Sequence, residues 1–343
     1  MKKIRWGVLG AAKIARTKVI PAMQRSVEGE VIALASRSLE KARSTADALG
    51  IPKSYGSYEE LLADRDVDAV YIPLPNHLHV PWSTKAAEAG KHVLCEKPIG
   101  LSADEGRALV AVRDRTKVLI QEAFMVRDHP QWLAVRDEVR GGRVGELRAI
   151  QMAFSYFNRD PANVRNKAEI GGGALMDIGC YPIVLSRFLF EDEPARVIAS
   201  IDRDPEFGTD RLTSCLLEFP RGQSAFTCST QLVPYQRTQV LGTRGRIEVE
   251  IPVNAPPDRP CRIFFDDGRD ALGTGVETRT FEACDQYTIQ ADLFCRAIRA
   301  GQPAPHPLED SVANMEVIDA LVRSERTGAW ERPGPRPELK PRG

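Results

Sequence analysis

The chain has 343 residues, of which 47 are Lys or Arg and 47 are Asp or Glu, so its formal net charge at neutral pH is zero. Binding to nucleic acid or to an anionic membrane surface depends on a large field of one sign, and the balanced charge argues against both. A chain of this length is long enough for two domains, each with its own core. We therefore expect a small-molecule substrate and no nucleic-acid or membrane partner.

The first residues carry charge, but the apolar run that follows them, Ile4 to Leu9, is too short for an export leader. No stretch approaches the roughly 18 uninterrupted apolar residues of a membrane helix. The seven cysteines are scattered, odd in number and without a CxxC pair, which is typical of free thiols in a reducing compartment. His77 and His79 have no Cys or acidic residue at ligand spacing, so we predict a cytoplasmic protein without a metal site.

Short apolar runs alternate with helical patterns through the first third of the chain. Such strands, separated by about 10 to 15 helical residues, indicate βαβ units and a parallel sheet. The predicted strands lie at 4–9, 30–36, 68–72, 91–95 and 118–122. We predict an α/β fold in which residues 1–123 form a doubly wound parallel sheet, the dinucleotide-binding Rossmann domain.

The first strand runs into the segment GAAKIA, residues 10–15, which has the G-x-G-x-x-G/A spacing of a dinucleotide turn. Gly10 provides the tight turn, and the amides at the helix start can face a pyrophosphate. Ala12 is a departure from the motif, because a methyl group stands where the backbone approaches the phosphates most closely. An ordinary turn of small residues is the alternative for this segment.

The second strand ends at Ser36, Arg37 and Ser38, where an NAD site would have an acidic residue for the ribose hydroxyls. A carboxylate would repel a 2′-phosphate, whereas an arginine with two hydroxyls would hold one. This favours NADP(H), with NAD(H) as the second choice. The alternative is that Ser38 caps the next helix, 39–49, and that Arg37 points into solvent.

Two further strand ends carry polar residues on the edge where open α/β sheets bind their ligands. The third strand is followed by the loop PLPNHLH, residues 73–79, and the fourth by Glu96, Lys97 and Pro98. A lysine at this edge could donate a proton, hold an oxyanion or bind a phosphate. A turn with a solvated Glu and Lys is the alternative.

The remainder, residues 124–343, has a different pattern. A helix opened by His129, a long strand at 147–157 and a polar loop at 158–166 precede short strands from 195 to 267 without long helices among them. This predicts an α+β domain with an open, mostly antiparallel sheet. Helices at 286–300 and 308–326 follow, and the proline-rich tail beyond Pro333 is predicted to be loose.

In the segment GGGALMDIGCY, residues 171–181, three glycines allow a ligand to approach the backbone closely. Asp177 and Tyr181 are four residues apart, which on a helix places both on one face. Pro182 would remove a helical hydrogen bond and could kink the segment. The alternative is a helix with a surface Asp and a core Tyr.

The series GVLGAAKIA, ASRS, PLPNHLH and CEKPIG, in this order and at these distances, resembles the family of glucose-fructose oxidoreductase and inositol dehydrogenase, Gfo/Idh/MocA. GGGALMDIGCY and FNRDPANVRN extend the resemblance over nearly the whole chain. It implies that Lys97, Asp177 and Tyr181 surround the carbon that exchanges hydride with a nicotinamide. Members of the family have either a histidine or a tyrosine at the position of Tyr181. With a tyrosine there, this sequence resembles the branch of NADP-dependent sugar dehydrogenases and dihydrodiol dehydrogenases. The resemblance also implies a homodimer through sheet-to-sheet packing, with a tetramer as the further assembly.

Oxidation of an alcohol or hemiacetal needs a base, and a neighbouring ammonium can lower the pKa of a tyrosine toward neutral pH. We predict Tyr181 as general acid/base, Lys97 as its electrostatic partner or proton relay, and Asp177 as an acceptor that orients a substrate hydroxyl. Whether Lys97 or Tyr181 moves the proton stays open. For the cofactor we predict contacts from residues of five segments: Gly10, Ala12, Lys13, Ile14, Ser36, Arg37, Leu74, Asn76, His79, Glu96, Lys97 and Arg165. A core or capping role is the alternative for His79.

The predicted activity is an NADP(H)-dependent oxidoreductase for a sugar-like substrate, first an aldose such as D-xylose or D-glucose oxidised at its anomeric carbon to a lactone. A trans-dihydrodiol dehydrogenase or a keto-sugar reductase is the second choice. A cofactor-binding sensor without catalysis is the non-enzyme alternative; it predicts loss of Lys97 or of the Asp177/Tyr181 set, and all three residues are present.

Overall fold

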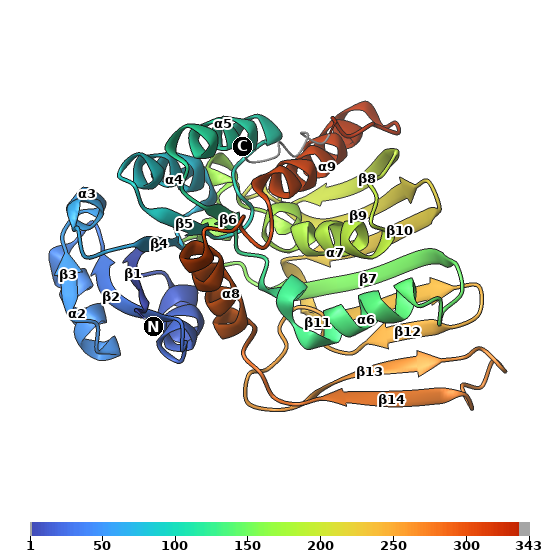
Figure 1. Cartoon of the computed structure of the whole chain (residues 1–343). Coiled ribbons are helices and arrows are strands. Elements are labelled where there is room, and N and C mark those ends of the chain that lie inside the picture. The colour runs from blue at the N-terminus through green and yellow to red at the C-terminus, as the bar shows by residue number, and fades with distance from the viewer. Residues whose placement is uncertain (1, 336–343) are drawn as a thin grey trace. The chain divides into compact units, whose positions relative to one another are not determined.

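The computed structural model describes residues 2–335 (Figure 1). Its contacts divide the chain into two compact units, and most of the predicted tail lies outside the described residues. Within those residues, the first unit contains 2–125 and Tyr287–Met315, and the second contains Val126–Gln286 and 316–335. A unit that is compact need not fold on its own, so this division does not test the predicted domains. The domains 1–123 and 124–343 therefore stay a prediction.

The first unit is built on a parallel sheet with the order β3-β2-β1-β4-β5-β6. The strands are short, and most of their side chains are buried, as expected for a sheet covered on both faces. They are β1 (Ile4–Leu9), β2 (Gly29–Ala35), β3 (Lys53–Tyr55), β4 (Ala69–Ile72), β5 (His92–Cys95) and β6 (Ile120–Glu122). The predicted Rossmann-like fold is confirmed, and β3 is a strand that the sequence analysis did not include.

The helices of this unit begin at side-chain caps that the sequence displays. Ser38, Ser57 and Ser102 each accept a hydrogen bond from the amide three residues later, which satisfies one of the unpaired donors of a helix start. The helical segments are η1 (Ala15–Val19), α1 (Ile20–Gln24), α2 (Leu39–Leu49), α3 (Tyr58–Ala63), η2 (Asn76–Leu78), α4 (His79–Glu88), α5 (Ala103–Thr116) and α8 (Gln286–Ala300).

Helix α8 joins the first unit through its apolar face, although it lies far along the chain. Phe294 and Cys295 are fully buried in the same cluster as Trp6 of β1. The rings of Trp6 and Phe294 have centroids 5.8 Å apart, and the Trp6 indole Nε1 donates to the Cys295 Sγ at 3.3 Å. Burial of this apolar face holds the segment 287–315 against the parallel sheet.

The second unit contains an eight-stranded sheet with the order β14-β13-β12-β11-β7-β10-β9-β8. All neighbouring strands are antiparallel except β7 and β10, so the prediction of a mostly antiparallel sheet is confirmed. The strands are β7 (Leu147–Phe157), β8 (Arg196–Arg203), β9 (Asp210–Phe219), β10 (Gly222–Ser229), β11 (Gln231–Gly242), β12 (Arg246–Val249), β13 (Cys261–Asp266) and β14 (Val276–Phe281).

Helices α6 and α7 lie along one face of this sheet (Figure 1). Along β9, buried residues such as Cys215, Leu217 and Phe219 alternate with partly exposed ones, as expected for a sheet with one covered face. The helical segments are η3 (Met125–Asp128), α6 (Pro130–Arg140), η4 (Val164–Asn166), η5 (Ala168–Ile170), η6 (Leu175–Gly179), α7 (Cys180–Phe190) and α9 (Leu308–Thr327), which enters this unit at residue 316.

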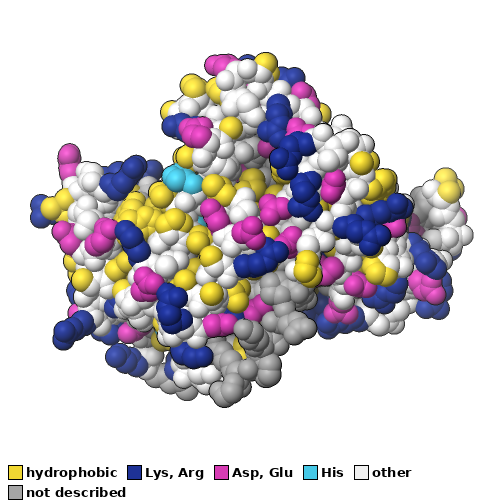
Figure 2. All heavy atoms as spheres, turned by 90° about the horizontal axis from the view of Figure 1, so that it is seen from above, with side chains coloured by type: hydrophobic (Ala, Val, Ile, Leu, Met, Phe, Trp, Pro, Cys, Tyr) yellow, Lys and Arg dark blue, Asp and Glu magenta, His cyan; other side chains and the backbone are white. Residues whose placement is uncertain are grey.

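The segment Ala168–Phe190, in which a glycine turn separates η5 from η6 and α7, is long and apolar enough to cross a membrane by length and composition. In the fold, 83% of its most apolar window is buried inside the protein, which is the situation of a core helix. On the face drawn in Figure 2, basic and acidic side chains are interspersed, in keeping with their equal numbers in the sequence.

We expect Phe294→Ala to lower the free energy of unfolding by about 3–5 kcal/mol, because it leaves a cavity beside Trp6 in a fully buried cluster. Urea unfolding followed by tryptophan fluorescence measures this change. Leu272→Ala is the control: this side chain is 89% exposed, and its loss is expected to change stability by less than about 0.5 kcal/mol. Equal effects of the two substitutions would contradict the packing of α8 described above.

Candidate functional site

The turn after β1 has the conformation that a dinucleotide turn requires. Gly10 has a φ of +118°, and a Cβ at this position would lie 2.9 Å from the Leu74 Cδ2. Its amide donates to the carbonyl of Ala35 at the end of β2. The first helical hydrogen bond runs from the Arg16 amide to the Ala12 carbonyl, so the amides before Arg16 precede the helical ladder. The backbone around Lys13 and Ile14 therefore fits a pyrophosphate.

At the end of β2, Ser36 is buried and Arg37 is exposed. Ser38 caps α2 by accepting from the Lys41 amide at 3.2 Å, as the alternative interpretation expected. Arg37 lies near Tyr58, whose pKa is raised by burial and lowered in part by the guanidinium. An exposed arginine at this strand end fits a 2′-phosphate, and its binding role stays a prediction.

His79 lies between two loops of the sheet edge. Its ring is 1% exposed, with Nδ1 2.7 Å from the Pro98 carbonyl oxygen and Nε2 2.7 Å from the Leu74 carbonyl oxygen. Burial lowers the pKa of His79 to about 4, although the two carbonyls oppose this shift. The neutral ring has one N–H, so it donates to only one of the two carbonyls. This position favours a structural role in joining the loops, while a cofactor contact of His79 stays a prediction.

The loop after β5 is held by two carboxylates. Tyr71 donates its hydroxyl to Glu96 Oε1 at 2.6 Å, and the Ile99 amide donates to Glu122 Oε1 at 2.7 Å. Burial and the Glu96 charge raise the pKa of Tyr71, so this tyrosine remains a neutral donor. Lys97, between these anchors, is partly exposed at the carboxyl end of β5. Its side chain is thus presented from a fixed backbone.

In the second unit, two residues converge on the Asp177 carboxylate, one of them predicted and the other not. Asp177 Oδ2 accepts from the Tyr156 hydroxyl at 2.6 Å and from Arg165 Nε at 2.8 Å. Asp177 raises the pKa of Arg165, and burial followed by the Asp177 charge raises the pKa of Tyr156, so both remain donors. Arg165, predicted to contact cofactor or substrate, is therefore bound to Asp177. Tyr156 was missed, because one polar residue in an alternating strand carries no motif.

Tyr181 follows Asp177 on the same helical run. The segment is π-helical over η6, just before Pro182, which cannot donate a helical hydrogen bond. The Tyr181 side chain is largely buried, and its ring centroid lies 6.1 Å from that of Phe154. The structure thus places Asp177, Tyr181 and Arg165 in the second unit, whereas Lys97 and the other predicted cofactor residues belong to the first.

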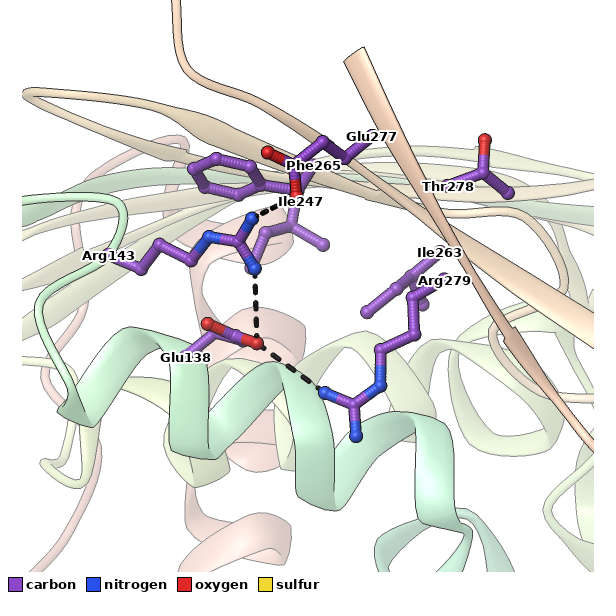
Figure 3. A pocket seen from close by; sticks show the side chains of 8 residues that line it. All are labelled: Glu138, Arg143, Ile247, Ile263, Phe265, Glu277, Thr278 and Arg279. Atoms are coloured by element: carbon purple, nitrogen blue, oxygen red, sulfur yellow. Dashed lines mark hydrogen bonds and ion pairs between the residues drawn. The ribbon is translucent and has the colours of Figure 1, made fainter. Parts of the chain in front are cut away.

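A pocket of about 170 Å³ lies in the second unit between α6 and the strands β12 to β14 (Figure 3). Its charged residues neutralise one another: Glu138 pairs with Arg143 and Arg279, and Arg143 also pairs with Glu277. None of the predicted site residues lines it. We therefore attribute these charges to the packing of α6 on the sheet. Among residues 2–335, no group of three or more His, Cys, Asp or Glu side chains is arranged to hold a metal ion.

Comparisons with known proteins agree over both units. Residues 4–124 match the model of an oxidoreductase family with an NAD-binding Rossmann fold, and residues 132–248 match the GFO/IDH/MocA C-terminal domain. An uncharacterized oxidoreductase from Rhizobium meliloti is 50% identical over 96% of this chain and 99% of its own. A D-xylose 1-dehydrogenase (NADP⁺) from Haloferax volcanii is 40% identical over 94% of this chain and 98% of its own.

The fold is also similar to a solved structure of a 3-ketoreductase from Actinomadura kijaniata in complex with NADP and TDP-benzene. The TM-score is 0.88 and the sequence identity 29%, over 94% of this chain and 98% of that one.

We expect Tyr156→Phe to lower the free energy of unfolding by about 1.5–3 kcal/mol, because it removes a hydrogen bond to a charged acceptor inside the protein. Urea unfolding at pH 8 measures the loss. Tyr235→Phe is the matched control, since this tyrosine is 52% exposed in the chain. If the two variants unfold at the same urea concentration, Tyr156 does not hold Asp177.

Proposed function

Because the chain belongs to the Gfo/Idh/MocA family of oxidoreductases, we propose that it is an NADP(H)-dependent enzyme that oxidises an aldose at its anomeric carbon to a lactone. The observation that carries the proposal is the Asp177 carboxylate, which Tyr156 and Arg165 fix in orientation four residues before Tyr181. A fixed charged acceptor close in sequence to a buried phenol suits the binding and deprotonation of a sugar hydroxyl. The similarity to an NADP⁺-dependent D-xylose 1-dehydrogenase supports this substrate class.

The cofactor, when bound, accepts the hydride from the anomeric carbon. Gly10, Ala12, Lys13 and Ile14 would hold its pyrophosphate, because the turn after β1 exposes amides before the helical ladder. Ser36 and Arg37 would hold the 2′-phosphate through a hydroxyl and a guanidinium. Further contacts are proposed from the loops after β4 and β5, at Leu74, Asn76, His79, Glu96 and Lys97. NAD(H) is the second choice.

The protein residues supply the proton chemistry. As the phenolate, Tyr181 accepts the hydroxyl proton during oxidation, and as the resulting phenol it returns the proton during reduction. The Lys97 ammonium stabilises negative charge on oxygen or relays the proton, and either residue can be the one that transfers it. Asp177 accepts from a substrate hydroxyl and orients the sugar, with Arg165 donating to the same carboxylate.

A keto-sugar reductase is the second candidate, favoured by the similarity to the 3-ketoreductase structure. It uses the same residues in the opposite direction, with Tyr181 donating the proton. A trans-dihydrodiol substrate remains a third choice. The presence of Lys97, Asp177 and Tyr181 together argues against a sensor that has lost catalysis.

We further propose a cytoplasmic homodimer, or a tetramer formed from two dimers, assembled through the second sheet. Partly exposed residues line the sheet face away from α6 and α7, and Phe157 and Tyr235 at the β7–β11 end are 64% and 52% exposed. Apolar area of this kind is a usual site of association between subunits.

The first experiment measures reduction of NADP⁺ and NAD⁺ by absorbance at pH 7 to 9 across D-xylose, D-glucose, other aldoses, inositol and a trans-dihydrodiol. Aldose-dependent reduction with NADP⁺ preferred is expected. Oxidation of NADPH with a 3-keto-sugar but no reduction with any aldose would instead support the reductase.

Lys97→Met serves as the control for the site. Fluorescence titration is expected to show that it keeps most of its affinity for NADPH, because Lys97 is only one of several proposed cofactor contacts. We expect kcat to fall by at least about a thousandfold, because both an ammonium charge and a proton relay are removed. Normal turnover by this variant would contradict the proposed site.

Arg37→Ala is expected to weaken NADPH binding by about tenfold to a hundredfold and to leave NADH binding nearly unchanged, because a charge-assisted bond to the 2′-phosphate is lost. Titration of both cofactors by fluorescence measures the difference. Arg43→Ala, an exposed arginine on the neighbouring helix α2, is the control. Equal losses for the two cofactors would remove the argument for the 2′-phosphate.

A further inference from the structure

A second carboxylate lies beneath the helix that carries Asp177 and Tyr181. Asp210, the first residue of β9, is 7% exposed. Its Oδ2 accepts from the Leu175 amide at 2.6 Å and from the Thr213 hydroxyl at 2.9 Å. Leu175 is the first residue of η6, so this oxygen receives one of the backbone donors near the start of the reactive helical segment.

The other oxygen of Asp210 faces the glycine turn before that helix. Gly173 has a φ of +119°, and a Cβ on it would lie only 1.8 Å from Asp210 Oδ1. The Gly173 amide donates to the Arg165 carbonyl at 2.9 Å, and its carbonyl accepts from the Asp177 amide at 3.1 Å. The carboxylate is thus packed against the one residue whose two backbone groups bind both members of the Asp177–Arg165 pair.

We propose that ionised Asp210 is a positioning residue for the reaction: it fixes the glycine turn and the start of η6, and thereby the orientation of Asp177 and Tyr181. This inference rests on the proposed function for the role of those two residues. Asp210 itself acts only through Leu175 and Gly173, without contact to substrate or cofactor.

Burial is the main influence on the ionisation of Asp210, and neighbouring polar groups moderate it. Burial raises the pKa of Asp210 from 3.8 to about 6, and the Leu175 amide, the Thr213 hydroxyl and, more weakly, Arg203 of β8 oppose the shift. The titratable groups coupled to it from the adjoining strands are Tyr156 of β7, Cys215 of β9 and Cys228 of β10, all with raised pKa values and hence neutral.

The sign of the linkage separates positioning from stability. The pKa of Asp210 is higher in the folded chain than in the unfolded chain, so its contribution to stability is complete below pH 4 and is lost as the pH rises through about 6. At neutral pH the ionised carboxylate therefore opposes folding. A residue kept only for stability would be better replaced by a neutral one, whereas a residue that positions the helix needs its charge.

The test compares Asp210→Asn with the parent enzyme in kcat, KM and melting temperature from pH 5 to 9. We expect kcat at pH 8 to fall by about tenfold to a hundredfold with KM changed less, because a small displacement of reacting groups costs that much. The melting temperature at pH 8 should equal or exceed that of the parent. We also expect the activity of the parent to decline below about pH 6, and the activity of the variant to show no such decline.

Asp202→Asn is the matched control, because Asp202 is an exposed carboxylate of β8 paired with Arg211, and it should leave every value unchanged. Asp210→Asn with parental kcat and a parental acid limb would overturn the proposal. If that variant does not fold, Thr213→Val is the second test. It removes one donor to the ionised carboxylate, so the decline of activity at acid pH should move to higher pH. An unchanged decline would also overturn the proposal.

Amide hydrogen exchange over residues 171–181 gives a readout that needs no substrate. We expect the Leu175 amide to exchange about tenfold faster in Asp210→Asn than in the parent at pH 8, after correction for intrinsic rates. Unchanged exchange would overturn the positioning role. The Leu175 amide could exchange faster in the variant even if the parent enzyme turned over no substrate. That result would contradict the proposed function but not the positioning of the helix by Asp210.

Discussion

The first unit depends on one constraint: all strands of its sheet run in the same direction, so their carboxyl ends meet at one edge. Gly10, Arg37, Leu74 and Glu96 are separated by up to 86 positions in the sequence, from 10 to 96, yet each follows a strand of this sheet. Two contacts between these loops follow from this arrangement. A Cβ on Gly10 would touch Leu74, and the His79 ring lies within hydrogen-bond distance of the carbonyls of Leu74 and Pro98.

The second unit meets a different problem, which is to hold charged groups away from water beside an antiparallel sheet. Asp177 receives a hydroxyl and a guanidinium, so its charge is paired. Desolvation of a carboxylate is costly unless such partners are present, and pairing also limits its rotation. The same two donors that make burial tolerable therefore orient the acceptor that a sugar hydroxyl would meet.

Much of the first unit and one long strand of the second follow from the sequence, because their signals are local. Periodicity, serine caps and glycine turns predict α2 at Leu39–Leu49 with both ends correct, and the strand β7 at Leu147–Phe157 likewise. Strand β3 is only three residues long, and β14 is almost wholly exposed, so neither displays the alternation that marks a strand. The roles of Tyr156 and Asp210 arise from contacts between segments 21 and 35 residues apart, which no local pattern encodes.

Asp177, which is partly buried, and Asp210, which is buried, show that two carboxylates of one unit can be stabilised in different ways. Asp177 is paired with the full charge of Arg165, whereas the short contacts of Asp210 come from an amide and a hydroxyl, which are dipoles. A dipole offsets less of the desolvation energy of an anion than a cation does, and the pKa of Asp210 is accordingly raised. A cation in place of Thr213 would stabilise the charge further, but it would also compete with Leu175 for the same oxygen. The weaker partners therefore leave the carboxylate directed at the helix start, at the cost of stability near neutral pH.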